Sequence, residues 1–173
     1  MSNIIKIPKA RVGPLVGTKG ETKKKLEKEL KAKIKVSSDG VIEYHSSDPL
    51  LELKLGYILK AIGRGFSADD SLTLLDDEYT FELISIEEFA GKNKNSIQRC
   101  RSRIIGSDGS VKMAIEEATK TKISIYGKTV GILGKFDDVA QAMESVGRLL
   151  KGASHKTVLE FLQRYVSSKY KGE

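Results

Sequence analysis

The chain of 173 residues contains one cysteine and two histidines, and each scarcity excludes a class of protein. The single cysteine, Cys100, cannot form an internal disulfide, which fits the reducing environment of the cytoplasm. The histidines, His45 and His155, lie far apart in sequence with no cysteine cluster beside them. We therefore expect a cytoplasmic protein with no disulfide framework, no metal site and no other cofactor.

Long apolar runs are missing as well. Apolar residues make up 39% of the chain, but none of them form a stretch long enough to span a bilayer. The first residues, Met-Ser-Asn-Ile-Ile-Lys, do not have the pattern of a secretory signal peptide. These observations predict no membrane association. The net charge of +7 favours polyanionic partners through long-range attraction.

The chain contains two similar segments. Gly-Thr-Lys-Gly at residues 17–20 recurs as Gly-Ser-Asp-Gly at residues 106–109, 89 positions further along. Each is followed by a helix-like run and then by a segment of alternating apolar residues, at 32–36 and 121–125. One Gly-x-x-Gly pair arises easily by chance, whereas two in matched contexts indicate a repeated unit.

In the first unit, residues 4–7 predict a short strand, and Pro8 and Pro14 limit the next helix to one or two turns. After the glycine pair, Leu26 and Leu30 lie on one face of a predicted helix. Residues 33–36 and 41–44 predict a hairpin. A final helix is expected to begin at Asp48-Pro49 and to run towards Gly63.

The second unit has the same order. Strands are predicted at 79–86, 122–125 and 130–133, and helices at 97–105, after Gly109, and at 139–150. One further amphipathic helix follows Gly152. We expect a first unit at residues 1–68, an acidic linker at 69–78, and a second unit with the C-terminal helix at 79–173.

The order strand-helix-helix-strand-strand-helix, with Gly-x-x-Gly between the first two helices, resembles the type I KH module, which binds RNA. The resemblance implies an α+β fold of two tandem KH units, each a three-stranded sheet with helices on one face. It also implies that each loop clamps about four nucleotides of single strand. A plain tight turn between helices is the alternative for a single loop.

The physical basis for such a clamp is close approach of the backbone. Glycine has no Cβ, and the amides at the start of the following helix favour an anion. Lys19 in the first loop is expected to attract phosphate, whereas Asp108 at the matching place is expected to repel it. Arg99, Arg101 and Arg103 precede the second loop, and they either compensate for Asp108 or form a solvated charged face of the helix.

In the second unit, the groove is expected between the helix that starts at Gly109 and the strand at 122–125, where Lys122 and Ser124 are free to meet bases. Lys23 and Lys112 stand where many KH modules have an apolar residue. The residues expected to contact RNA are Gly17, Thr18, Lys19, Gly20, Lys23, Lys33, Lys35, Arg99, Arg101, Arg103, Gly106, Ser107, Asp108, Gly109, Lys112, Lys122 and Ser124.

Residues 119–125, 132–136 and 149–156 narrow the resemblance to the partner-of-Nob family of small-subunit assembly factors, whose archaeal members carry little beyond two KH units. Membership would imply no enzymatic activity, binding to the 3′ region of small-subunit rRNA, and contact with the Nob-type endonuclease or other assembly and translation factors. The alternative is a KH-fold adaptor that binds proteins and hardly touches RNA. The acidic stretch supports some protein contact because it would repel RNA.

Overall fold

The computed structural model describes residues 2–171 and divides them into two compact units, one ending at Asp77 and the other beginning at Glu78.

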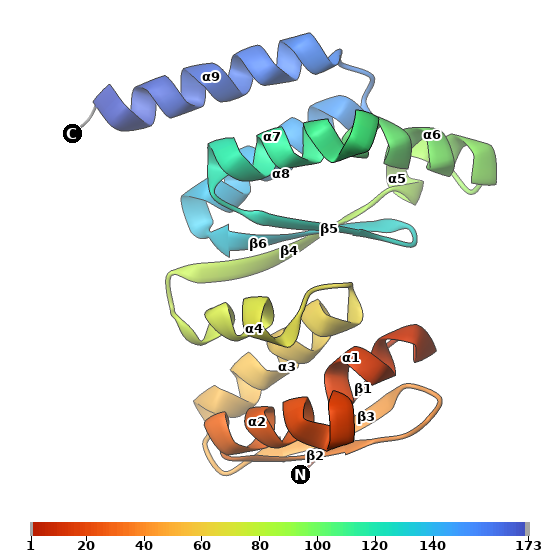
Figure 1. The fold of residues 1–173 in the computed structure, drawn as a ribbon, viewed down its shortest axis with the longest axis vertical. Helices are drawn as coiled ribbons and strands as arrows, with labels where there is room; N and C mark the ends of the chain where they lie inside the picture. Colours follow the sequence, from red (N-terminus) through yellow and green to blue (C-terminus); the bar gives the residue numbers. More distant parts are fainter. Residues whose placement is uncertain (1, 172–173) are drawn as a thin grey trace. The chain divides into compact units, whose positions relative to one another are not determined.

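The first unit has the expected order of elements (Figure 1). A single turn of 3-10 helix, η1 (Lys9–Arg11), lies between the first strand and the first helix. The elements are β1 (Asn3–Lys6), α1 (Val12–Val16), α2 (Glu21–Glu29), β2 (Ala32–Val36), β3 (Val41–Ser46) and α3 (Pro49–Gly63). The strands form an antiparallel sheet in the order β1-β3-β2, so β2 is an edge strand beside α2.

Alternation along β2 decides which face of this sheet is buried. Ala32 and Ile34 are buried under the helices, whereas Lys33 and Lys35 point to the opposite, exposed face. All three helices cover the same face, as Figure 1 shows. The sequence supplies only one apolar face per sheet, which explains the two-layer arrangement.

Helix α3 begins and ends where the sequence predicts. The Asp48 carboxylate accepts hydrogen bonds from the amides of Leu50 and Leu51 and caps the helix, and Pro49 occupies its first position. At the other end, a Cβ on Gly63 would lie 2.6 Å from a methyl group of Ile7. The glycine therefore allows α3 to pack closely against the segment that follows β1.

The expected linker at 69–78 is instead largely folded. Residues in it form α4 (Ala68–Ser71) and η3 (Leu72–Leu75), both packed on α3, with Leu74 buried. The Lys54 ammonium donates to the Leu75 carbonyl and pairs with the Asp77 carboxylate, both at 2.7 Å. The acidic residues of this stretch suggested a linker, although its leucines are apolar. The first unit therefore extends to Asp77.

The second unit repeats the pattern and adds two helices. Its elements are β4 (Tyr79–Ser85), α5 (Glu87–Ala90), α6 (Lys94–Ile105), α7 (Ser110–Thr119), β5 (Lys122–Tyr126), β6 (Thr129–Lys135), α8 (Phe136–Leu150) and α9 (His155–Lys171). The sheet order is β4-β6-β5, again antiparallel with the edge strand beside the helix that follows the loop. The short helix α5 was not predicted. Helix α6 begins three residues early, where Asn93 caps it.

The C-terminal helix α9 is confirmed. It packs against α7 and α8 on the side away from the sheet, as Figure 1 shows, and buries Val158 and Leu162. The core of the second unit therefore consists of two layers, one between sheet and helices and one between those helices and α9. The first unit, up to Asp77, carries α4 and η3 rather than such a long helix.

Candidate nucleic-acid interface

The two Gly-x-x-Gly loops have almost the same backbone. Each contains one turn of 3-10 helix, η2 (Thr18–Gly20) and η4 (Ser107–Gly109). Lys19 has φ 55° and ψ 25°, and Asp108 has φ 53° and ψ 29°, so both residues are left-handed. The first glycine has φ 74° in both loops. Nearly the same geometry in two unlike sequences indicates that the loop conformation is a property of the repeated unit.

The two glycines of each loop are needed for different reasons. A Cβ on Gly17 would lie 2.9 Å from the backbone nitrogen of Thr22, and one on Gly106 would lie 2.8 Å from that of Val111. A Cβ on Gly20 would meet nothing within 4 Å, so only its positive φ of 74° favours glycine there. The loop thus keeps its first glycine against its own helix and leaves the surface above its second glycine open.

The exposed tips of the two loops differ in charge. Thr18 and Lys19 are exposed in the first loop, and Ser107 and Asp108 are exposed in the second. Both tips lie just before the N-terminus of a helix, where backbone amides have no partner within the helix. The first loop therefore presents amides and an ammonium group, whereas the second presents amides and a carboxylate.

The lysines one turn into the following helices are paired. Lys23 forms an ion pair with Glu27 at 3.8 Å, and Lys112 forms one with Glu116 at 3.5 Å. The same glutamates accept hydrogen bonds from edge-strand amides. Sequence reasoning did not single out these glutamates. The signal was present, because both stand four residues after a matched lysine.

The strand lysines lie elsewhere. Lys33, Lys35 and Lys122 are exposed on the face of each sheet opposite the helices, because the isoleucines between or beside them are buried. Ser124, on the same alternation as Lys122, is half-buried. Lys122 also lines a pocket together with Met113 and Glu116 of α7. The groove predicted for Lys122 and Ser124 lies between the same helix and β5, and their contact with RNA stays a prediction.

The three arginines before the second loop have three different environments. Arg99 is exposed. Arg103 donates to the Leu149 carbonyl at 3.2 Å, and its own carbonyl accepts from the Nε2–H of His155 at 3.0 Å. The Nε of Arg101 is buried without a hydrogen-bond partner among residues 2–171.

Arg103 thus caps the C-terminal end of α8 by binding one of its last carbonyl groups. In the first unit Arg11 does the same for α3, donating to the Ile62 carbonyl at 2.8 Å. Ile62 and Leu149 occupy matched positions in the repeat. An arginine that binds the last carbonyls of this helix is therefore part of the architecture of both units.

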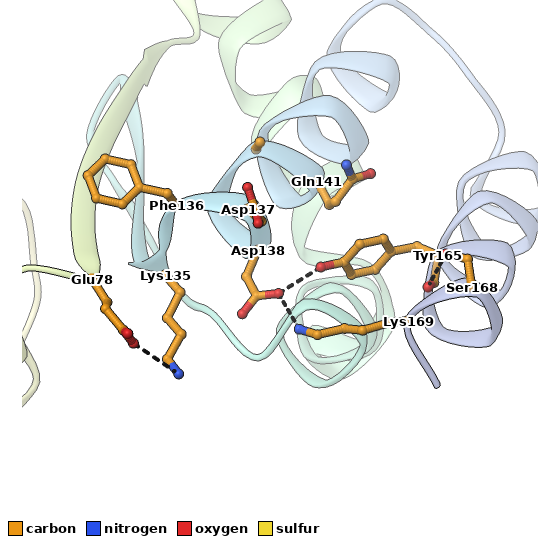
Figure 2. Close-up of a pocket in the computed structure, with 10 residues that line it drawn as sticks. Glu78, Lys135, Phe136, Asp137, Asp138, Gln141, Tyr165, Ser168 and Lys169 are labelled. Atoms are coloured by element: carbon orange, nitrogen blue, oxygen red, sulfur yellow. Dashed lines mark hydrogen bonds and ion pairs between the residues drawn. The ribbon is translucent and has the colours of Figure 1, made fainter. Parts of the chain in front are cut away.

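A pocket in the second unit lies between α8 and α9 (Figure 2). One oxygen of the buried Asp138 carboxylate accepts from the Tyr165 hydroxyl at 2.7 Å and from the Lys169 ammonium at 2.6 Å. Lys135 and Glu78 form a second ion pair at its rim, at 3.4 Å. Figure 2 shows Tyr165 and Lys169 pointing from α9 towards α8, so this cluster fastens the C-terminal helix.

Burial and charge act in opposite directions on the pKa of Asp138. Burial raises the pKa, but the hydrogen bonds from Lys169 and Tyr165 and the nearby positive charges outweigh burial and hold the pKa below its usual range. The pKa of Lys169 is raised, chiefly by its hydrogen bond to Asp138. Asp138 is therefore ionised at neutral pH, and its charge serves helix packing.

Within residues 2–171, no group of three or more His, Cys, Asp or Glu side chains could hold a metal ion. No helix in that range is long and apolar enough to cross a membrane.

Family models match most of the chain. A model for the second KH domain of PNO1, described as a eukaryotic type KH-domain of type I, matches residues 80–167. A general KH domain model matches residues 2–53. The two matches each contain one of the Gly-x-x-Gly loops.

Individual proteins resemble the chain along most of its length. A KH domain-containing protein of Methanocaldococcus jannaschii is 44% identical over 165 residues, which cover 93% of this chain and 72% of that protein. The pre-rRNA-processing protein PNO1 of Kluyveromyces lactis is 39% identical over 113 residues, 63% of this chain, but the match spans only 40% of the PNO1 protein.

A solved structure is similar in fold and sequence. A chain in a crystal structure of an a/eIF2alpha-aDim2p-rRNA complex from Pyrococcus horikoshii aligns with a TM-score of 0.88 and 35% identity. The alignment covers 97% of this chain and 95% of that one.

Proposed function

We infer that this chain, which belongs to the PNO1-type family of KH proteins, is a single-stranded RNA-binding protein that acts in assembly of the small ribosomal subunit. Its ligand is the 3′ region of small-subunit rRNA. The match to the PNO1-type KH model and the long alignment with the Methanocaldococcus relative establish the family. The pre-rRNA-processing name of the PNO1 relatives, and the rRNA in the Pyrococcus complex, support rRNA as the ligand.

The main support for this proposal is that the two Gly-x-x-Gly loops have nearly the same backbone conformation. In each unit a left-handed turn leaves the second glycine open and places it at the start of a helix. A phosphate can approach the amides there without meeting a side chain. Bases attached to that backbone would then enter the groove between the helix and the edge strand. Positive net charge draws the polyanion to the surface.

The chain acts by binding, in the cytoplasm, and the cutting of rRNA belongs to a Nob-type endonuclease partner. An exposed apolar stripe on α3 supports contact with an assembly or translation factor. Leu50, Leu53 and Tyr57 are each about half exposed, at 57%, 58% and 47%. The matched positions of α8 carry polar or small residues, namely Asp137, Ala140 and Glu144. Because the fold does not require an apolar stripe there, a partner is its best explanation.

RNA binding can be tested with a labelled 12-nucleotide strand from the 3′ end of an archaeal small-subunit rRNA. We expect binding to the single strand and weak binding to its duplex, with an affinity that falls as salt rises, by about 0.7 log units per phosphate contacted for each log unit of salt. Giving each loop two adjacent aspartates, with Thr18→Asp and Lys19→Asp in the first and Ser107→Asp in the second, should abolish binding.

The control is Lys60→Gln, which removes an exposed lysine from α3 and should leave most of the affinity. If the loop variant keeps its fold by circular dichroism and still binds as tightly as the unmodified protein, the loops are not the RNA clamp. The adaptor function would then be the better account.

A further inference from the structure

The first unit has a hollow beside its edge strand β1. Helix α3 runs along this strand, because the Asn3 side-chain amide donates to the Glu52 carboxylate at 2.7 Å and the side chain of Ile7 lies against Gly63 further along both elements. A hollow of about 390 Å³ lies between β1 and α3. Its walls include Ile5 of β1, Tyr44 of β3, and Leu53, Gly56 and Tyr57 of α3.

A glycine in the middle of α3 leaves space in this hollow. Glycine destabilises a helix interior relative to alanine, so Gly56 needs a reason other than helix formation. A Cβ there would lie 2.8 Å from the Tyr44 hydroxyl. The matched residues of the second unit are Met143 in the helix and Ile132 in the strand, and both pack in the core of that unit. The second unit therefore places a side chain of its own where the first unit has none.

The outer edge of β1 offers backbone groups beside the hollow. This strand is at the edge of its sheet, with β3 as its neighbour. The amide of Ile7 donates to the Gly40 carbonyl at 2.9 Å, which places the odd-numbered residues of β1 in the hydrogen-bonded pairs with β3. Ile4 and Lys6 therefore direct their N–H and C=O groups away from the sheet. An extended peptide can bind these four groups as an added strand.

The alternation of side chains along such a strand decides what it must carry. The residue opposite Ile5 would point to the same face of the sheet as Ile5 and enter the hollow beside Leu53 and Tyr57. The residues on either side of it would lie opposite Ile4 and Lys6 on the other face. Ile4 is 71% exposed and favours an apolar neighbour, whereas Lys6 favours an acidic one.

We propose that this edge binds an extended segment of a protein partner by strand addition, and that the segment carries an acidic residue followed by two apolar residues. The segment runs antiparallel to β1, the more stable pairing. Its acid then pairs with Lys6, its first apolar side chain fills the hollow, and its second covers Ile4. Lys60, an exposed residue that lines the hollow, adds to the attraction for an acidic segment.

This inference rests on the proposed contact of α3 with a protein factor and does not depend on RNA binding. It names the form that the contact takes. Two successive outward pairs of N–H and C=O match the backbone of another extended peptide, which has the same spacing of donors and acceptors. RNA has no such repeat, so a peptide is the better occupant of this edge.

The test titrates the whole chain against a fluorescein-labelled octapeptide of serine and glycine with a central Asp-Leu-Ile, and follows anisotropy. We expect saturable binding that weakens at least about tenfold when the leucine is replaced by glycine, because the hollow stays empty. Methylation of the Asp and Ile backbone nitrogens should also weaken binding about tenfold, since these amides donate to the carbonyls of Lys6 and Ile4. Methylation of the leucine nitrogen, which faces away from β1, is the matched control and should have little effect.

A protein variant tests the hollow itself. Tyr44→Ile with Gly56→Met installs the pair that the second unit carries as Ile132 and Met143. The methionine should fill the hollow and weaken peptide binding at least about tenfold, while the affinity for single-stranded RNA stays the same.

Because an exchange in the core can disturb folding, a second variant changes only exposed positions. Leu53→Ser with Tyr57→Ser removes two walls of the hollow and should weaken peptide binding about tenfold without loss of fold. The control is Phe136→Ser, which removes an apolar side chain of similar exposure, 59%, from α8. It should bind the peptide as the unmodified protein does.

Three results would overturn the inference. A peptide that does not bind, or that binds equally well to the folded variants, would show that the hollow is not its site. Equal effects of the two kinds of methylation would show that no strand is added. A dimer of the chain that Leu53→Ser with Tyr57→Ser dissociates would show that a second copy covers this edge. Binding of the rRNA strand, measured on the same proteins, tests the proposed RNA function separately.

Discussion

The loops of the two units have the same backbone conformation but differ in charge. Comparing them therefore separates two contributions to RNA binding, the shape of the loop and the charge at its tip. Lys19 and Asp108 occupy the same left-handed position within a few degrees. Aspartate tolerates that conformation better than lysine does. The lysine of the first loop is therefore the more costly choice for the fold, and its charge at the exposed tip is a reason to keep it. The second loop keeps the shape of a clamp without the cation.

The largest expected effect concerns the shape that the loops share. Gly17→Ala should lower the free energy of unfolding of the first unit by roughly 3 kcal/mol, because the new methyl group meets the start of α2 and the positive φ is strained. Gly20→Ala should cost only about 1 kcal/mol, since its methyl group would point into open space. Urea denaturation measures both. Equal losses would show that close approach to Thr22 does not define the loop.

The next effect tests charge in the first loop. Lys19→Asp should weaken binding of single-stranded RNA roughly 10- to 30-fold, because an attraction becomes a repulsion where the backbone passes. The variant gives the first loop the charge of the second, and its melting temperature should not fall, because aspartate tolerates this left-handed backbone better than lysine and already occupies it as Asp108. Anisotropy titration measures the affinity. An unchanged affinity with an unchanged melting temperature would remove the first loop from the interface.

The reverse exchange should have a smaller effect of opposite sign. Asp108→Lys should tighten RNA binding about fivefold and steepen the salt slope, because it removes a repulsion and adds a cation at an exposed tip. Titrations at several salt concentrations give both quantities. Weaker binding would mean that the Asp108 carboxylate accepts a specific hydrogen bond from a base or a ribose hydroxyl.

The arginines before the second loop should separate into two roles. Arg99→Ala should weaken RNA binding about threefold and make the salt slope shallower by about 0.7, as expected for loss of one phosphate contact. Arg103→Ala should instead lower stability by about 1 kcal/mol, because it removes the hydrogen bond to the Leu149 carbonyl. If Arg103→Ala changes the salt slope and leaves stability alone, its guanidinium leaves α8 to bind RNA.

The last effect concerns α9, the C-terminal helix of the second unit. The pKa of Asp138 is held below its usual range in the folded state, so its contribution to stability is present above the unfolded pKa of about 4 and is lost as pH falls through the folded pKa. Asp138→Asn should cost about 1 kcal/mol at pH 7 and less below about pH 4. Melting curves across that range test the sign. A variant as stable as the unmodified protein at pH 7 would show that the cluster does not fasten α9.

Local signals were sufficient for most of the fold. Asp48-Pro49 and Gly63 marked the two ends of α3, and the matched glycines revealed the repeat. The stretch at 69–78 was misread as a linker because its aspartates dominate the composition, whereas Leu74 is buried on α3. A polar stretch with three leucines, at positions 72, 74 and 75, is ambiguous until the surface against which they pack is known.

Some features of the candidate site could likewise be predicted from the sequence, and others could not. The positions of Gly17, Lys19 and Asp108 follow from sequence, because a four-residue loop is a local structure. The role of Arg103 does not, since its partner Leu149 lies 46 residues away. Likewise, Glu27 and Glu116 look like ordinary helix surface until the edge strand folds back beside them.

The sequence by itself determined that the chain folds as two KH units, each with a glycine loop opening a helix, because these features depend on residues close together in the chain. Only the tertiary structure decided which charges are available to a ligand. Lys19 and Asp108 stay exposed at the loop tips, whereas Arg103 and Lys23 are held by partners. Charge depends on residue type, but whether a charge is satisfied within the protein depends on what packing brings within hydrogen-bonding distance.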